Sequence, residues 1–119
     1  MKLRVLILFV VLLMSATGGV KTVLGTMAIG GALKKDQAGE FLSYYKERGY
    51  NELDSAIMYG TGKTEVVLGH LAAAKQFVVS TKANPWFHNG KTTREQKASL
   101  DAEGIATQLK LSLSRLQVK

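Results

Sequence analysis

The chain has 119 residues with 46% hydrophobic and 21% charged side chains, a globular composition that excludes a largely disordered chain. It contains no cysteine, which excludes disulfides and cysteine nucleophiles. Its two histidines, His70 and His88, have no metal-binding spacing, so we expect no metal site. The net charge of +7 comes from scattered lysines and arginines without interleaved aromatics, which indicates a solvated basic surface and no nucleic-acid interface.

The first residues have the plan of a secretory signal peptide. Lys2 and Arg4 precede an apolar run, Val5–Met14, and small and polar residues follow it. The run is shorter than the roughly 20 apolar residues of a transmembrane span. A buried strand is the alternative, since short apolar runs fit both. We expect a signal-peptide-like leader at residues 1–18, with membrane contact only if it stays uncleaved.

The next segment predicts a strand followed by a helix. A short apolar strand, Val20–Leu24, ends at Gly25, and a loop over residues 26–35 follows. We expect Asp36 to cap the helix and Gly49 to end it. The apolar side chains of one helical face are Ala38, Phe41, Leu42 and Tyr45.

Two further strand–helix pairs follow. The strands are Tyr50–Ala56 and Phe77–Ser80, and the loop between the first strand and its helix contains Gly60 and Gly62. Thr61 or Thr64 caps the middle helix, whose apolar side is Val67, Leu68 and Leu71. After a polar loop at residues 88–98, Ser99 or Asp101 opens the last helix, whose apolar stripe is Ile105, Leu109, Leu113 and Leu116.

This alternation predicts an α/β fold with a parallel sheet and right-handed crossovers. The three units form either a small open α/β layer or a section of a (β/α)8 TIM barrel. A complete barrel needs about 250 residues, so only part of one is present.

Three polar residues follow strand ends, where parallel α/β folds place their active sites. Asp54 lies at the carboxyl end of the second strand, Tyr59 in the loop after it, and Lys82 just after the third strand. An ammonium group beside a phenol lowers the phenol's pKa from about 10, and a carboxylate keeps that ammonium charged. Such a tyrosine can protonate a carbonyl oxygen while a cofactor supplies hydride.

Each of these residues also has a simpler structural explanation when taken alone. Asp54 can cap a turn, Tyr59 can be a half-buried loop aromatic, and Lys82 can be a surface lysine at a strand end. The pattern by itself leaves these alternatives open.

Several segments match a known family in order and spacing, over about residues 20–119. They are Val23–Met27, Glu52–Tyr59, Gly62–Gly69, Thr81–Trp86 and Gln108–Gln117. Together they resemble the aldo-keto reductases, most closely the aflatoxin-aldehyde reductase subgroup. The sequence TKANPW is the most specific stretch.

The resemblance implies that residues 20–119 are the first three βα units of an NADP-dependent barrel that reduces aldehydes or ketones to alcohols. Tyr59 would donate the proton, with Lys82 beside it and Asp54 supporting Lys82. The residues expected near the nicotinamide of NADPH are Gly25, Thr26, Met27 and Asp54, and Trp86 would shape the substrate pocket or pack a loop. The family binds this cofactor without the G-x-G-x-x-G loop, which is absent here.

The chain also departs from the family. The family's catalytic histidine follows the fourth strand, and neither His70 nor His88 matches its position. We therefore expect weak or no activity from the chain alone, and self-association through the open sheet edge. The alternatives are a non-catalytic truncated remnant or an exported binding protein. The leader suggests the secretory pathway, whereas the family resemblance suggests the cytoplasm.

Overall fold

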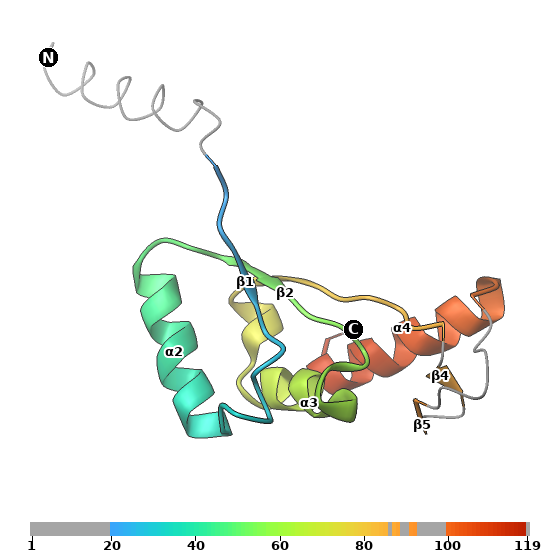
Figure 1. Cartoon of the computed structure of the whole chain (residues 1–119). Coiled ribbons are helices and arrows are strands. Elements are labelled where there is room, and N and C mark those ends of the chain that lie inside the picture. The colour runs from blue at the N-terminus through green and yellow to red at the C-terminus, as the bar shows by residue number, and fades with distance from the viewer. Residues whose placement is uncertain (1–19, 86, 89–90, 93–99, 119) are drawn as a thin grey trace, which may run out of the picture.

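The computed structural model describes residues 20–85, 87–88, 91–92 and 100–118 (Figure 1). The leader predicted at residues 1–18 lies outside the described residues, and so does Trp86, which was predicted to shape the substrate pocket or pack a loop. The main elements are β1 (Val23–Gly25), α2 (Lys35–Glu47), β2 (Glu52–Asp54), α3 (Lys63–His70), β3 (Val78–Ser80) and α4 (Ala102–Leu116). Short 3-10 helices at Tyr59–Gly62 (η1) and Ala73–Lys75 (η2) flank α3.

The three main strands form a parallel sheet in the order β1-β2-β3. Leu53 lies between Leu24 and Val79 in register, and Asp54 lies between Gly25 and Ser80. This arrangement confirms the predicted α/β class and the succession of three βα units. In Figure 1, β1 and β2 lie side by side, with α2 on one side and α3 and α4 together on the other.

The core lies between one face of this sheet and the helices. Leu53 is completely buried, and Leu24 and Val79 pack against the same cluster. The helices contribute apolar side chains that include Ala38, Leu42, Tyr45, Leu68 and Leu116. Because successive strand residues point to opposite faces, their neighbours Val23 and Val78 face away from the helices, and they are 47% and 61% exposed.

Helix α2 begins earlier than the sequence predicts. The Lys34 N–H donates to the Gln37 side-chain oxygen at 3.1 Å, so Lys34 is the cap and Asp36 lies in the first turn. The prediction of Asp36 as the cap is wrong. A carboxylate is favourable both at the cap and in the first turn, beside the positive end of the helix dipole, so the sequence does not distinguish the two positions. Phe41 is also more exposed than expected, at 42%. Gly49 follows the helix with a φ of 84° and its N–H bonded to Lys46 O, as predicted.

Helix α3 is capped by Gly62 rather than by a threonine. The hydroxyl of Thr64 donates to the Ile29 carbonyl at 2.7 Å, and this buried bond ties the loop after β1 to the helix. Thr61 precedes Gly62 in the left-handed region, with a φ of 55°. The prediction of Thr61 or Thr64 as the cap is therefore wrong, since Thr64 satisfies a distant carbonyl instead.

Helix α4 begins as predicted, because an Asp101 carboxylate oxygen accepts from the Gly104 N–H at 2.8 Å. Its predicted apolar stripe is only partly correct. Leu116 is buried, but Ile105 and Leu109 are 45% and 52% exposed. The buried face is instead Gln108, Ser112 and Leu116.

The reason for this face lies in the packing of α4 against α3. A Cβ added at Gly69 of α3 would lie 2.0 Å from the Arg115 carbonyl oxygen, so the two backbones approach closely. Close approach favours small side chains such as Ser112. Gln108 is held by a bond from the Asn84 N–H to its side-chain oxygen at 2.7 Å. Close backbone approach and the bond to Gln108 therefore add Ser112 and Gln108 to the buried face that Leu116 anchors in the core.

Part of the polar loop predicted at residues 88–98 forms a small hairpin. Strands β4 (Phe87–His88) and β5 (Lys91–Thr92) pair antiparallel. Strands of two residues are too short to leave a periodic signal in the sequence. Of the helices within the described ranges, none combines the length and apolarity needed to cross a membrane.

Candidate active site

The carboxyl ends of β2 and β3 bring Asp54 and Lys82 together. Asp54 is the last residue of β2, and Lys82 follows the end of β3 by two residues. The Lys82 ammonium nitrogen lies 2.5 Å from a carboxylate oxygen of Asp54 and donates to the Ser55 carbonyl at 2.7 Å. Both interactions hold the lysine side chain at the edge of the sheet.

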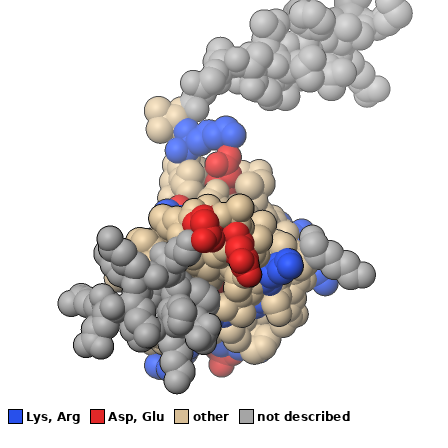
Figure 2. All heavy atoms as spheres, turned by 90° about the vertical axis from the view of Figure 1, so that its right-hand side faces the viewer, with Lys and Arg blue, Asp and Glu red and all other residues tan. Residues whose placement is uncertain are grey.

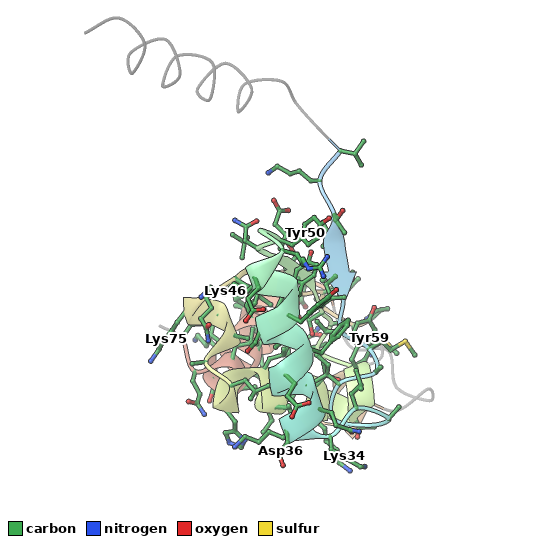
Figure 3. All side chains as sticks on the ribbon, turned by 90° about the vertical axis from the view of Figure 1, so that its left-hand side faces the viewer. Lys34, Asp36, Lys46, Tyr50, Tyr59 and Lys75 are labelled. Atoms are coloured by element: carbon green, nitrogen blue, oxygen red, sulfur yellow. The ribbon has the colours of Figure 1, made fainter. Side chains whose placement is uncertain are left out.

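Tyr59 reaches the same edge from the loop after β2. It is the first residue of η1, and its N–H donates to the Ala56 carbonyl at 3.0 Å. The Lys82 nitrogen lies 5.7 Å from the centre of the Tyr59 ring, within the range of a cation–π contact. Figure 3 shows Tyr59, which follows β2, well apart from Tyr50, which precedes β2. The structure thus gathers Asp54, Tyr59 and Lys82, while their roles stay predictions.

The ion pair between Lys82 and Asp54 is open to solvent. The two side chains are 51% and 39% exposed. An ion pair this exposed contributes about 0–1 kcal/mol to folding. The pair therefore adds little to the stability of the fold.

The residues predicted to line the nicotinamide lie beside Asp54. A Cβ added at Gly25 would meet nothing within 4 Å, and Met27 is 71% exposed. Thr26 is buried, and both its N–H and its hydroxyl donate to the Asp54 carbonyl at 3.0 Å. Gly25 therefore borders open space at the end of β1, and the bonds from Thr26 join the ends of β1 and β2.

A second ion pair lies at the amino ends of the strands, away from the candidate site. Lys21 contacts Glu52 at 2.9 Å, and this hydrogen bond raises the pKa of the Lys21 ammonium group. On the described surface shown in Figure 2, acidic and basic side chains are interspersed. Among the described residues, no group of three or more histidines, cysteines or carboxylates is placed to hold a metal ion.

A buried polar cluster next to the candidate site was missed from the sequence. Glu65 of α3 is completely buried and contacts Thr81 and Arg115. One signal was available, because Glu65 stands three residues before the buried Leu68 and so shares its helical face. A carboxylate on a buried face requires a partner, but its identity is not readable from the local pattern.

Comparison with known proteins identifies the family that has this fold. The model of the Aldo/keto reductase family matches residues 21–119. The chain therefore belongs to the aldo/keto reductase family, and the resemblance noted in the sequence is confirmed.

The curated relatives named aflatoxin B1 aldehyde reductase member 2 include a human and a rat protein. The chain is 37% identical over 103 residues to the Homo sapiens protein and 39% identical over 101 residues to the Rattus norvegicus protein. These matches cover 82% and 81% of this chain but only 26% and 25% of the relatives. The chain thus spans about a quarter of their length.

Among solved structures, the chain is similar to the aldo-keto reductase AKR11C1 from Bacillus halodurans in its holo form. The TM-score is 0.66 at 27% sequence identity. The match covers 82% of this chain and 32% of that one. The three βα units therefore correspond to about a third of a solved aldo-keto reductase.

Proposed function

We propose that this chain carries part of an NADPH-dependent reductase site, with Asp54, Tyr59 and Lys82 as catalytic residues. The substrates would be small aldehydes or ketones, and the products alcohols. The single observation that supports this most is the Lys82 ammonium, which contacts the Asp54 carboxylate at 2.5 Å and lies 5.7 Å from the Tyr59 ring centre.

In this proposal, Tyr59 gives its proton to the carbonyl oxygen of the substrate. The negative charge that develops on the phenol oxygen is stabilised by the nearby Lys82 ammonium, and Asp54 keeps that ammonium oriented. Gly25, Thr26 and Met27 would hold the nicotinamide end of the cofactor beside Asp54. The cofactor, when bound, supplies the hydride to the carbonyl carbon.

We also propose that residues 20–119 are the N-terminal part of a (β/α)8 barrel and that the chain alone is weak or inactive. The short coverage of its relatives supports this, and so do Val23 and Val78, whose exposed side chains line the sheet face turned away from the helices. Self-association through the open edge of the sheet stays a prediction. Neither His70 nor His88 matches the position of the catalytic histidine that the family resemblance implies, which also lowers the expected rate.

The first test measures NADPH oxidation by the purified 119-residue chain with an aromatic aldehyde. We expect little or no turnover. Ordinary reductase rates from the chain alone would contradict the proposed incompleteness.

The second test examines the site itself in a chimaera. Residues 21–118 replace the matched segment of the rat aflatoxin B1 aldehyde reductase member 2, so that the relative supplies the rest of the chain. We expect turnover, and we expect Tyr59→Phe to lower kcat by roughly 100- to 10,000-fold, because a general acid typically contributes that factor.

The matched control is Tyr50→Phe, which removes a phenol at the other end of β2. It should leave kcat nearly unchanged. If Tyr59→Phe and Tyr50→Phe had equal effects in a folded, active chimaera, Tyr59 would not be the proton donor.

A further inference from the structure

We propose that Glu65, which is fully buried, and Arg115, which is largely buried, are positioning residues that fix the place of Tyr59 relative to Lys82. The inference rests on the proposed function for its meaning, because it concerns the same site. It adds to that site two residues that contact neither the phenol nor the ammonium directly.

Glu65 uses both carboxylate oxygens, and each one serves a different segment. One oxygen accepts from the hydroxyl of Thr81 at 2.8 Å, and Thr81 is the residue before Lys82. The other oxygen lies 3.2 Å from a guanidinium nitrogen of Arg115 on α4. Glu65 therefore connects the end of β3 to α4 from a fully buried position.

Arg115 extends the connection to the loop that carries Tyr59. The same guanidinium nitrogen donates to the Ile57 carbonyl at 3.2 Å, and Ile57 stands two residues before Tyr59. The Ile57 N–H in turn donates to the Lys82 carbonyl at 3.2 Å. The bonds form a closed ring that passes through the backbone beside both candidate catalytic residues.

The space around Arg115 allows little alternative placement. A Cβ added at Gly62 would lie 2.6 Å from the centre of the guanidinium group. A Cβ added at Gly69 would lie 2.0 Å from the Arg115 carbonyl oxygen. Two glycines therefore leave room for this arginine, and its side chain is only 16% exposed.

Directional bonds distinguish this cluster from ordinary core packing. A buried carboxylate is unfavourable without a partner, and well-packed apolar residues often stabilise a fold as well as a buried ion pair does. Apolar side chains of similar volume could fill this space, but they could not fix the direction of the Thr81 hydroxyl or the Ile57 carbonyl. The cluster is therefore suited to holding the Thr81 hydroxyl and the Ile57 carbonyl in fixed directions.

The test uses side-chain NMR on the full 119-residue chain, with no cofactor or turnover required. It follows the hydrogen-exchange rate of the Lys82 ammonium and the ring signals of Tyr59, assigned by Lys82→Met and Tyr59→Phe. The variants are Thr81→Val, which keeps shape and loses the donor, Thr81→Ser, which keeps the donor, and Arg115→Lys. Lys46→Met is the matched control, because Lys46 of α2 lies apart from Tyr59 (Figure 3) and its ammonium donates to the side chain of Gln76.

We expect Thr81→Val to raise the exchange rate of the Lys82 ammonium several-fold and Thr81→Ser to restore it. Arg115→Lys keeps a charge near Glu65 but loses the bond to Ile57, so it should shift the Tyr59 ring signals. Lys46→Met should change neither. Amide spectra and thermal unfolding show that each variant is folded.

The proposal is overturned if folded Thr81→Val and Arg115→Lys leave both signals as Lys46→Met does. If these variants do not fold, the proposal is tested on the unsubstituted chain by the exchange of its Arg115 protons. Slow exchange of the Arg115 guanidinium protons supports the ring of bonds, and exchange as fast as that of an exposed arginine overturns it. If Tyr59→Phe left the kcat of the chimaera unchanged, the reductase proposal would fail, but these NMR results would not change.

Discussion

Tyr45 shows how one side chain joins α2 to two strands. Its ring is buried at 7% exposure and stacks on Tyr50 with the ring centres 5.0 Å apart. Its hydroxyl donates to the Thr22 carbonyl at 2.7 Å and to the Glu52 carbonyl at 3.2 Å. Burial raises the pKa of Tyr45 above its usual value of 10.0, since the phenolate would lose its hydration.

This raised pKa predicts a loss of stability at alkaline pH. The unfolded chain releases the Tyr45 proton near pH 10, whereas the folded chain retains it. The free energy of unfolding therefore keeps the full contribution of Tyr45 below pH 10 and declines as the pH rises through the folded-state pKa. Tyr45→Phe should cost about 0.5–1.5 kcal/mol at neutral pH and flatten this alkaline decline.

Urea unfolding of both proteins across this pH range measures the effect. Tyr44→Phe is the control, because Tyr44 on the same helix is 53% exposed. It should retain the alkaline decline of the parent chain. An undiminished decline in Tyr45→Phe would assign the pH dependence to another group.

At the scale of the elements, the end of α4 carries identifiable strain. Gln117 has a φ of 57°, in the left-handed region that favours glycine. Its N–H bonds to the Ser114 carbonyl at 3.2 Å, and the Val118 N–H bonds to the Leu113 carbonyl at 3.0 Å. These two bonds form a Schellman motif, whose terminal position glycine usually occupies.

Gln117→Gly should therefore raise the free energy of unfolding by about 1 kcal/mol, because it removes the steric cost of the left-handed conformation. Thermal unfolding provides the measurement. Gln117→Ala serves as the control, since alanine loses the same side chain but keeps the Cβ. Equal stabilities for the glycine and alanine variants would exclude backbone strain as the cause.

At the scale of the whole molecule, the contact between α3 and α4 joins the last helix to the sheet. Gly69 allows this contact, because a Cβ there would lie 2.0 Å from a backbone oxygen that cannot move aside easily. The same contact places Arg115 beside Glu65. The packing at Gly69 therefore affects both the stability of the chain and the placement of Arg115 beside Glu65.

Gly69→Ala should lower the free energy of unfolding by about 1–3 kcal/mol, because overpacking outweighs the usual preference for alanine in a helix. Gly25→Ala is the matched control, since its Cβ would meet nothing within 4 Å. Denaturant titrations should show a change for Gly25→Ala within about 0.5 kcal/mol. Equal losses for both variants would contradict the proposed close packing.

The sequence predicted most of the fold and the principal grouping of the candidate site. Short apolar runs and the helical spacing of about 3.6 residues predicted the order of strands and helices. The carboxyl ends of parallel strands meet at one edge, which was sufficient to expect Asp54, Tyr59 and Lys82 close together. Helix caps were less predictable, as Lys34 and Gly62 show, because several neighbouring residues can satisfy a helix end.

The sequence by itself therefore determined the α/β alternation, the membership of the family and the residues at the sheet edge, all of which depend on local pattern and spacing. Only the tertiary structure decided that Glu65 meets Thr81 and Arg115, and that Gln108 and Ser112 are buried while Ile105 and Leu109 are exposed. The physical reason is that these outcomes depend on how closely two helices approach and which distant groups complete a hydrogen bond. Neither quantity is encoded in the periodicity of a single segment.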